Sequence, residues 1–220
     1  MLSQILLVDD HPIVRQGIRC LIEKEFGLMV CTEAADAPSA LALIEQTHPD
    51  MVVVDLALKH SSGLDLVLAI KQRWEDMPIL VLSMYDEEVY AERVLCAGAS
   101  GYIMKQDAST KIITAIGDVL NGSIYVSENV SSRLLQKIAD GRVSTSWVDT
   151  LSNREVQVFQ MIGEGLTYSH IAEMLVLSVK TIESHVDNIK KKLSIDSGRE
   201  LLQRATEWVL RSQNQIPHSL

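Results

Sequence analysis

The most constraining feature of the sequence is an apolar run that ends in a single carboxylate. Residues 51–54 read MVVV and lead directly into Asp55. A short run rich in β-branched residues is typical of a strand that is buried on both faces, as in a parallel sheet. Asp55 would then lie at the carboxyl end of that strand, where open α/β sheets bind their ligands. Taken alone, Asp55 is equally well explained as a residue that caps the next segment.

Three further predicted strands also end in polar side chains. They span residues 4–8, 78–82 and 101–104, and the residues that follow them are Asp9, Asp10, Ser83 and Lys105. Three carboxylates at one sheet edge repel one another unless a cation neutralises them. A hard divalent ion with oxygen ligands, above all Mg²⁺, fits that set. With the metal, an ammonium and a hydroxyl at hand, the edge suits a phosphoryl group on Asp55.

The first half of the chain alternates strands with helices. Strands are predicted at 4–8, 28–33, 51–55, 78–82 and 101–104, and helices at 12–25, 37–47, 63–73, 87–97 and 109–121. Such alternation predicts a doubly wound, five-stranded parallel sheet with helices on both faces. Residues 1–121 are therefore predicted to form one α/β domain.

A connecting segment follows this domain. Residues 122–147 are predicted to be a linker, because glycines and a Ser-Thr-Ser run punctuate them. Within the linker, residues 128–139 have the apolar spacing of a short amphipathic helix. The boundary to the second domain is predicted between Gly141 and Thr150.

The last third of the chain predicts helices and no strands. Ser152 and Glu155 have the spacing of a capping box, and Thr167 and Ser178 are typical N-caps of two further helices. Residues 148–220 are therefore predicted to form a small all-α domain.

The helix predicted over residues 179–193 has two contrasting faces. Its core stripe consists of Ile182, Val186, Ile189 and Leu193. The opposite face carries polar and basic side chains, namely Lys180, Ser184, Asp187, Asn188 and Lys191. Such a face fits the major groove of DNA. Taken alone, an ordinary solvated face is the more common explanation of the same pattern.

The first half of the chain resembles the receiver domain of bacterial response regulators. The resemblance rests on five residues in the family's order and on its strand ends: Asp9, Asp10, Asp55, Ser83 and Lys105. It implies a flavodoxin-like fold, phosphorylation of Asp55 by a sensor histidine kinase, and Mg²⁺ held by the three carboxylates and the backbone carbonyl of Ala57. Ser83 and Lys105 would contact the phosphoryl group, and Tyr102 would swing inward on activation.

The last third resembles the LuxR-type helix-turn-helix, through LSNRE at 151–155, GLT at 165–167 and KTI at 180–182. Joined to a receiver, it is similar to the NarL/FixJ class of response regulators. The resemblance implies that the helix over 179–193 contacts promoter DNA through Lys180, Thr181, Glu183, Ser184, Asp187, Asn188, Lys191 and Lys192. It also implies that the last helix pairs two such domains through Leu201, Leu202, Ala205 and Val209.

Two features depart from the family pattern. Leu58, Lys59 and His60 stand near where receivers usually have a Met-Pro pair, which bears on the lifetime of the phosphoryl group. Residues 151–220 hold eight basic and eight acidic residues, so the whole formal charge of −9 belongs to the first 150 residues. A DNA-binding domain without net positive charge must concentrate its bases locally. We therefore expect modest electrostatic affinity and a role for a homodimer promoted by phosphorylation.

Two other classes of function stay open. One is a Mg²⁺-dependent phosphotransfer enzyme or phosphatase, and the other is a DNA-binding protein that works without phosphorylation. The sequence shows no evident set of substrate-pocket residues for such an enzyme, and the receiver's own phosphoryl transfer and slow dephosphorylation, the only catalysis expected, explain the same residues. The complete set of five receiver residues disfavours the second class. RNA polymerase is a further expected partner. Three cysteines without paired spacing and the lack of a long apolar run predict a reduced, cytoplasmic protein that does not enter a membrane.

Overall fold

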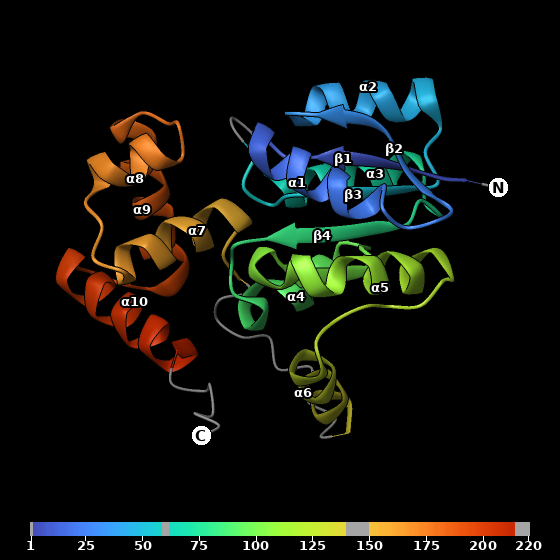
Figure 1. Ribbon diagram of the computed structural model, residues 1–220. Helices are drawn as coiled ribbons and strands as arrows, with labels where there is room; N and C mark the ends of the chain where they lie inside the picture. Colours follow the sequence, from blue (N-terminus) through green and yellow to red (C-terminus); the bar gives the residue numbers. More distant parts are fainter. Residues whose placement is uncertain (1, 59–61, 140–149, 214–220) are drawn as a thin grey trace. The chain divides into compact units, whose positions relative to one another are not determined.

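The computed structural model describes residues 2–58, 62–139 and 150–213 (Figure 1). The chain divides into two compact units, Met1–Arg142 and Val143–Leu220. The boundary predicted between Gly141 and Thr150 lies outside the described residues. Among the described helices, none is long and apolar enough to cross a membrane.

A parallel sheet forms the centre of the first unit (Figure 1). Its five strands are β1 Ser3–Val8, β2 Leu28–Ala34, β3 Met51–Val54, β4 Ile79–Ser83 and β5 Gly101–Met104. They lie in the order β2-β1-β3-β4-β5. The strand order reverses between β1 and β3, and such a switch point is where α/β sheets bind ligands.

Five helices connect and flank the strands: α1 Pro12–Ile22, α2 Ala37–Thr47, α3 Gly63–Arg73, α4 Glu87–Cys96 and α5 Ala108–Leu120. Side chains of α1 and α5, among them Ile18 and Ile116, pack with inward residues of the sheet in one apolar cluster. All four residues of β3 are completely buried. The predicted doubly wound sheet is therefore confirmed.

Most element bounds differ from the predicted ones by at most a single residue, and two larger differences stand out. Helix α1 ends at Ile22 rather than at residue 25, because residues 23–26 are exposed and a further turn would bury nothing. Lys105–Asp107 form a short 3-10 turn, η1, so that the helical path towards α5 begins directly after β5. The second difference keeps Lys105 at the edge of the sheet.

Helix α6, Glu128–Ala139, is the helix predicted within the linker, and it belongs to the first unit. It packs against α4 and buries Val130 completely.

The second unit consists of α7 Asn153–Gly163, α8 Tyr168–Met174, α9 Val179–Leu193 and α10 Gly198–Gln213. Ser152 and Glu155 form the predicted capping box, and Thr167 and Ser178 cap α8 and α9 as predicted. Helices α7 and α10 approach so closely that a Cβ on Gly163 would lie 2.5 Å from the Ala205 carbonyl oxygen. Glycine is therefore required at this crossing.

Candidate phosphoacceptor site and nucleic-acid interface

Three buried carboxylates meet at the carboxyl ends of β1 and β3. The two strands pair in parallel with Val8 opposite Val54, so the residues that follow are neighbours. Side-chain ligand atoms of Asp9, Asp10, His11 and Asp55 all lie within 4.8 Å of one another. Asp9, Asp10 and Asp55 are each no more than 8% exposed. The predicted acidic cluster is therefore present, on rigid strand ends.

Lys105 reaches this cluster from the end of β5. Its Nζ lies 2.7 Å from Asp55 Oδ2 and 2.6 Å from Asp9 Oδ2. Burial raises the pKa of Asp55, and Lys105 opposes that effect without overcoming it. Burial disfavours the charged ammonium, yet Asp55 and Asp9 outweigh it and the pKa of Lys105 is raised. Lys105 therefore stays charged and is the counter-ion for two carboxylates.

The donor set fits a magnesium ion. The imidazole Nδ1 of His11 lies 2.7 Å from Asp10 Oδ1, and the His11 backbone N–H donates to Asp9 Oδ1 over 2.7 Å. One ammonium offsets only one of three buried negative charges, so a further cation is favoured. Carboxylate oxygens are the ligands that Mg²⁺ takes in proteins. Asp9, Asp10 and Asp55 would hold the ion, and a contribution from the Ala57 carbonyl stays a prediction.

Ser83 and Tyr102 lie beside the cluster and share one neighbour. Ser83 Oγ, at the end of β4, accepts from the Tyr85 backbone N–H over 3.1 Å. The Tyr102 hydroxyl donates to the Tyr85 carbonyl over 2.6 Å, and its ring is only 1% exposed. Burial raises the pKa of Tyr102 well above its usual range. In this structure Tyr102 therefore points inward, and Tyr85 joins it to Ser83.

The loop after Asp55 is described only in part. Leu58 is buried, at 3% exposure, in keeping with an apolar plug. Lys59 and His60 lie outside the described residues, so their influence on the phosphoryl group stays a prediction.

Helix α9 presents the polar face that its spacing predicts. Ile182, Val186 and Ile189 are buried, whereas the opposite face is exposed at Lys180, Glu183, Ser184, Asp187, Asn188 and Lys191. Thr181 is half-buried and bonded to the Ser178 cap. Within the described chain, no ion pair joins Asp187 to Lys191, four residues further on. The acidic Asp187 therefore stands on this face without the intrahelical partner that its spacing allows.

Lys192 differs from the other residues that the family resemblance assigns to DNA. Its Nζ lies 2.7 Å from Glu155 Oε2, and Glu155 is 4% exposed. That carboxylate also accepts from the Ser152 backbone N–H over 2.7 Å. Lys192 therefore helps to hold α9 against α7, and its contact with DNA stays a prediction.

The predicted dimerisation residues of α10 are for the most part not on the surface. Leu201 and Ala205 are fully buried and Val209 is 8% exposed, because this stripe packs against α7. The prediction is therefore wrong for these three residues, whose apolar spacing serves the core of the small domain. Leu202 is 47% exposed, and Leu210 on the same helix is 51% exposed.

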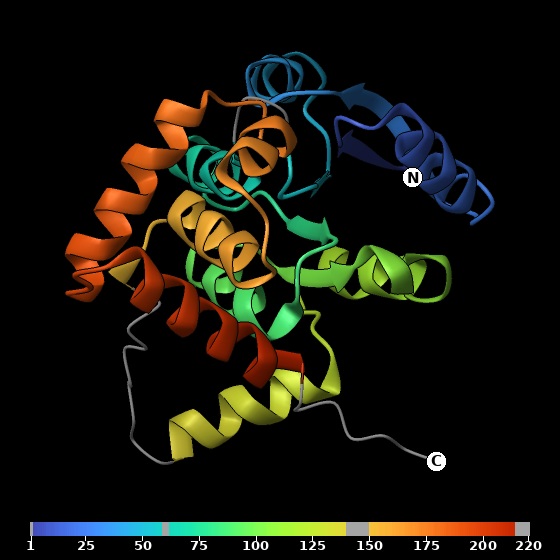
Figure 2. The same ribbon diagram turned by 90° about the vertical axis from the view of Figure 1, so that its left-hand side faces the viewer.

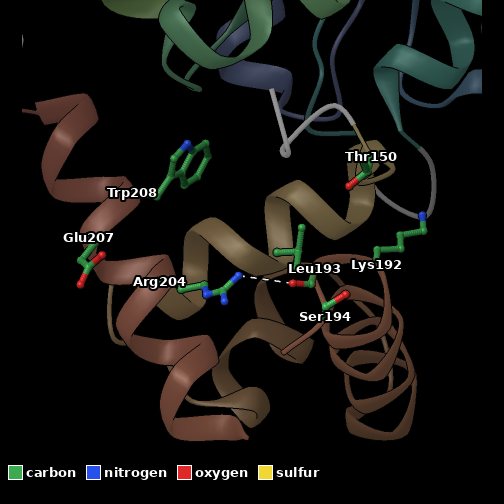
Figure 3. Close-up of a pocket in the computed structure, with 7 residues that line it drawn as sticks. All are labelled: Thr150, Lys192, Leu193, Ser194, Arg204, Glu207 and Trp208. Atoms are coloured by element: carbon green, nitrogen blue, oxygen red, sulfur yellow. Dashed lines mark hydrogen bonds between the residues drawn. The ribbon is translucent and has the colours of Figure 1, made fainter. Parts of the chain in front are cut away.

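A hollow of about 400 Å³ lies between the end of α9 and the middle of α10. Figure 3 shows Arg204 reaching from α10 to the carbonyl of Leu193 at the end of α9, with Trp208 one turn further along. Arg204 also pairs with Glu200, and Lys192 pairs with Glu155. The two cations of the hollow are thus neutralised within the domain, which they help to hold together.

The turn between α8 and α9 contains a strained residue. Val176 has φ 53°, in the left-handed region, and its side chain is 44% exposed. A β-branched residue in this region is an outlier that costs roughly 1–2 kcal/mol. The turn is therefore strained, and the apolar side chain of Val176 is partly exposed to water beside the first turn of α9.

The doubly wound sheet gathers three carboxylates and a lysine at its switch point, and the same chain carries a helix-turn-helix. Together these features define the architecture of a two-component response regulator. The family of response regulator receiver domains matches residues 5–117, and the luxR family of bacterial regulatory proteins matches residues 149–205. The chain belongs to the NarL/FixJ family of response regulators, which join a receiver to a LuxR-type DNA-binding domain.

Known relatives match along almost the full chain. The oxygen regulatory protein NreC of Staphylococcus carnosus is 34% identical over 92% of this chain and 96% of its own length. A nitrate/nitrite response regulator homologue of Haemophilus influenzae is 29% identical over 88% of this chain and 91% of its own. RcsB of Salmonella enterica serovar Typhimurium, solved bound to promoter rprA with the phosphomimetic BeF3−, has TM-score 0.61 and 28% identity, covering 94% of this chain and 99% of that chain.

Proposed function

We propose that a sensor histidine kinase phosphorylates Asp55 and that this modification controls how the protein binds promoter DNA. The observation that carries the proposal is Lys105, which reaches across the sheet edge to both Asp55 and Asp9. A structural ion pair needs one partner, whereas a phosphoryl group on Asp55 needs a cation on one side and carboxylates that hold a second cation on the other.

Each residue then has a role in phosphoryl transfer. A carboxylate oxygen of Asp55 attacks phosphorus while the bond to the donor breaks, and Lys105 balances charge on the phosphoryl oxygens. The Ser83 hydroxyl donates a hydrogen bond to one of those oxygens. Mg²⁺, when held by Asp9, Asp10 and Asp55, neutralises the others. Slow hydrolysis of the acyl phosphate by water returns the carboxylate, and no other catalysis is proposed.

The test is a mass measurement on the intact protein. Incubation with acetyl phosphate and Mg²⁺ is expected to add one phosphoryl group, and Asp55→Asn is expected to abolish the addition. Asp65→Asn, an exposed carboxylate on α3, is the matched control and is expected to keep it. Continuous consumption of the donor without a stable mass increase would instead favour a phosphatase.

DNA contact by the exposed face of α9 belongs to the same proposal. RcsB structures contain promoter DNA, and one holds two dimers on two DNAs. Lys180 and Lys191 would bind phosphates, which position a protein without reading sequence. Leu202 and Leu210 offer an exposed apolar surface for a phosphorylation-promoted homodimer, and RNA polymerase is the further partner expected at a promoter.

Asp187 is expected to read a base. Because its charge repels phosphate, its favourable role in the groove is to accept from a cytosine N4 amino group. Asp187→Ala should then cost about 1–3 kcal/mol on the cognate duplex and relax preference at one base pair. Lys191→Ala should weaken all duplexes alike and reduce the salt slope by about one.

Titrations of both variants against cognate and scrambled duplexes at several salt concentrations separate these effects. Tighter binding of Asp187→Ala to every duplex would show that the carboxylate only repels DNA.

A further inference from the structure

Helix α6 is attached to α4 mainly by polar bonds, although its sequence is amphipathic. Ser127, the residue before α6, donates to Glu87 Oε1 over 2.6 Å, and Asn129 donates to Glu88 Oε1 over 3.1 Å. Arg133 Nη2 donates to the Glu88 carbonyl over 2.6 Å, and Lys137 pairs with Glu92. A ladder of hydrogen bonds and ion pairs thus runs along the two helices.

The apolar side chains of α6 are mostly left in water. Val130 is 1% exposed and Leu134, four residues further on, is half-buried, whereas Leu135 is 64% and Ile138 is 76% exposed. In Figure 2, α6 is the yellow helix at the lower edge of the view. A helix that belonged permanently to the core would turn these residues inward. The attachment therefore rests on charge complementarity between acidic α4 and the basic residues of α6.

An attachment of this kind is weak enough to open. Partly exposed ion pairs each contribute little, because water and salt screen them. One buried valine and one half-buried leucine add only a modest apolar contribution. The attachment of α6 is therefore weak enough for a single modification to reverse it.

A short chain of contacts joins α4 to the phosphoacceptor site. Ser83 accepts from the Tyr85 N–H, and Tyr85 stacks on Tyr90 of α4 with ring centroids 4.9 Å apart. Tyr90 is itself only 1% exposed, so it is fixed in the core of the unit. A change in the contacts of Ser83 can therefore be transmitted to the first turns of α4, where Glu87 and Glu88 bind α6.

We propose that the acidic face of α4, made by Glu87, Glu88 and Glu92, is a docking surface for α6, and that phosphorylation of Asp55 releases α6 from it. The release step rests on the proposed function. When the Ser83 hydroxyl turns to the phosphoryl group, its bond with Tyr85 changes and α4 moves relative to the ladder. The released helix spans 12 residues, or about 18 Å, just before the chain continues to the second unit. The switch thereby changes the tether of the DNA-binding domain.

Hydrogen exchange of the α6 amides in the full chain tests the docking surface directly. Glu92→Lys or Lys137→Glu places like charges opposite each other and should raise exchange of α6 by about tenfold. The double variant Glu92→Lys/Lys137→Glu restores opposite charges and should return exchange close to the wild-type rate. Arg73→Glu, which breaks an exposed ion pair between Arg73 of α3 and Glu45 of α2, is the matched control and should leave α6 unchanged. Equal exchange in the wild type and both single variants would overturn the docking surface.

The release step has its own readout. After treatment with acetyl phosphate and Mg²⁺, wild-type α6 should exchange about as fast as in Lys137→Glu, and Asp55→Asn should not respond. Intact mass measured on the same sample reports phosphorylation. Phosphorylated protein with unchanged α6 exchange would overturn release while leaving the proposed function standing. Absence of the mass increase would overturn the proposed function and release together, whereas the charge-reversal result would still decide the docking surface.

Discussion

Lys105→Met is expected to lower the free energy of unfolding of the metal-free receiver by about 3–5 kcal/mol. The substitution keeps most of the length of the side chain but leaves Asp9 and Asp55 buried without their shared counter-charge. Mg²⁺ should recover much of the lost stability, because it neutralises the same carboxylates. Urea unfolding of the receiver transition, with and without Mg²⁺, measures both effects.

Lys111→Met is the matched control, since Lys111 of α5 pairs with Asp107 of η1 in an exposed setting. Its cost should stay below about 1 kcal/mol. The loss of unfolding free energy that Lys105→Met causes should also be smaller at low pH. Burial raises the pKa of Asp55, so the carboxyl takes up a proton readily when its counter-ion is removed. If Lys105→Met were as stable as the wild type when both are measured without Mg²⁺, the counter-ion role of Lys105 would be contradicted.

Glu155→Ala is expected to destabilise the DNA-binding domain by about 2–3 kcal/mol at neutral pH. The change removes half of a capping box and leaves Lys192 without its partner. Burial raises the pKa of Glu155, but Lys192 and Ser152 outweigh it and hold the pKa below its ordinary range. The carboxylate thus stabilises the fold above its unfolded-state pKa, and this contribution is lost as pH falls through the folded-state value.

Thermal unfolding followed between neutral and acidic pH tests this linkage. The difference in stability between the wild type and Glu155→Ala should become smaller as pH falls. At low pH only the part that is due to packing should remain. Glu164→Ala, an exposed glutamate of the α7 cap bonded to Gln160, is the matched control and should show little effect at any pH. A difference that is constant with pH would mean that the charge of Glu155 contributes nothing.

The sequence predicts the phosphoacceptor cluster well, because strand ends are marked by local patterns. An apolar run followed by Asp55, and another followed by Asp9 and Asp10, fixes which side chains share a sheet edge once the strands are parallel. The role of Tyr85 could not be predicted in this way. It supplies a backbone carbonyl and N–H, which any residue type would offer.

Patterns that serve two purposes explain the errors. Leu201, Ala205 and Val209 have the spacing of an apolar helix face, and such a face can pack within a domain or between two domains. Packing within the domain is favoured here because α7 approaches this face closely, and that approach depends on Gly163. Likewise Lys192 lies among three consecutive lysines, and the sequence does not tell which of them turns towards Glu155.

The strained turn at Val176 has a consequence for the lifetime of the protein in a cell. Strain of roughly 1–2 kcal/mol multiplies the unfolded fraction of a domain by roughly 5 to 30. Proteases cleave chains in proportion to that fraction when unfolding and refolding are fast relative to cleavage. Under that condition a regulator with this turn is expected to be removed sooner than one with a relaxed turn, so its concentration should follow changes in its synthesis more closely.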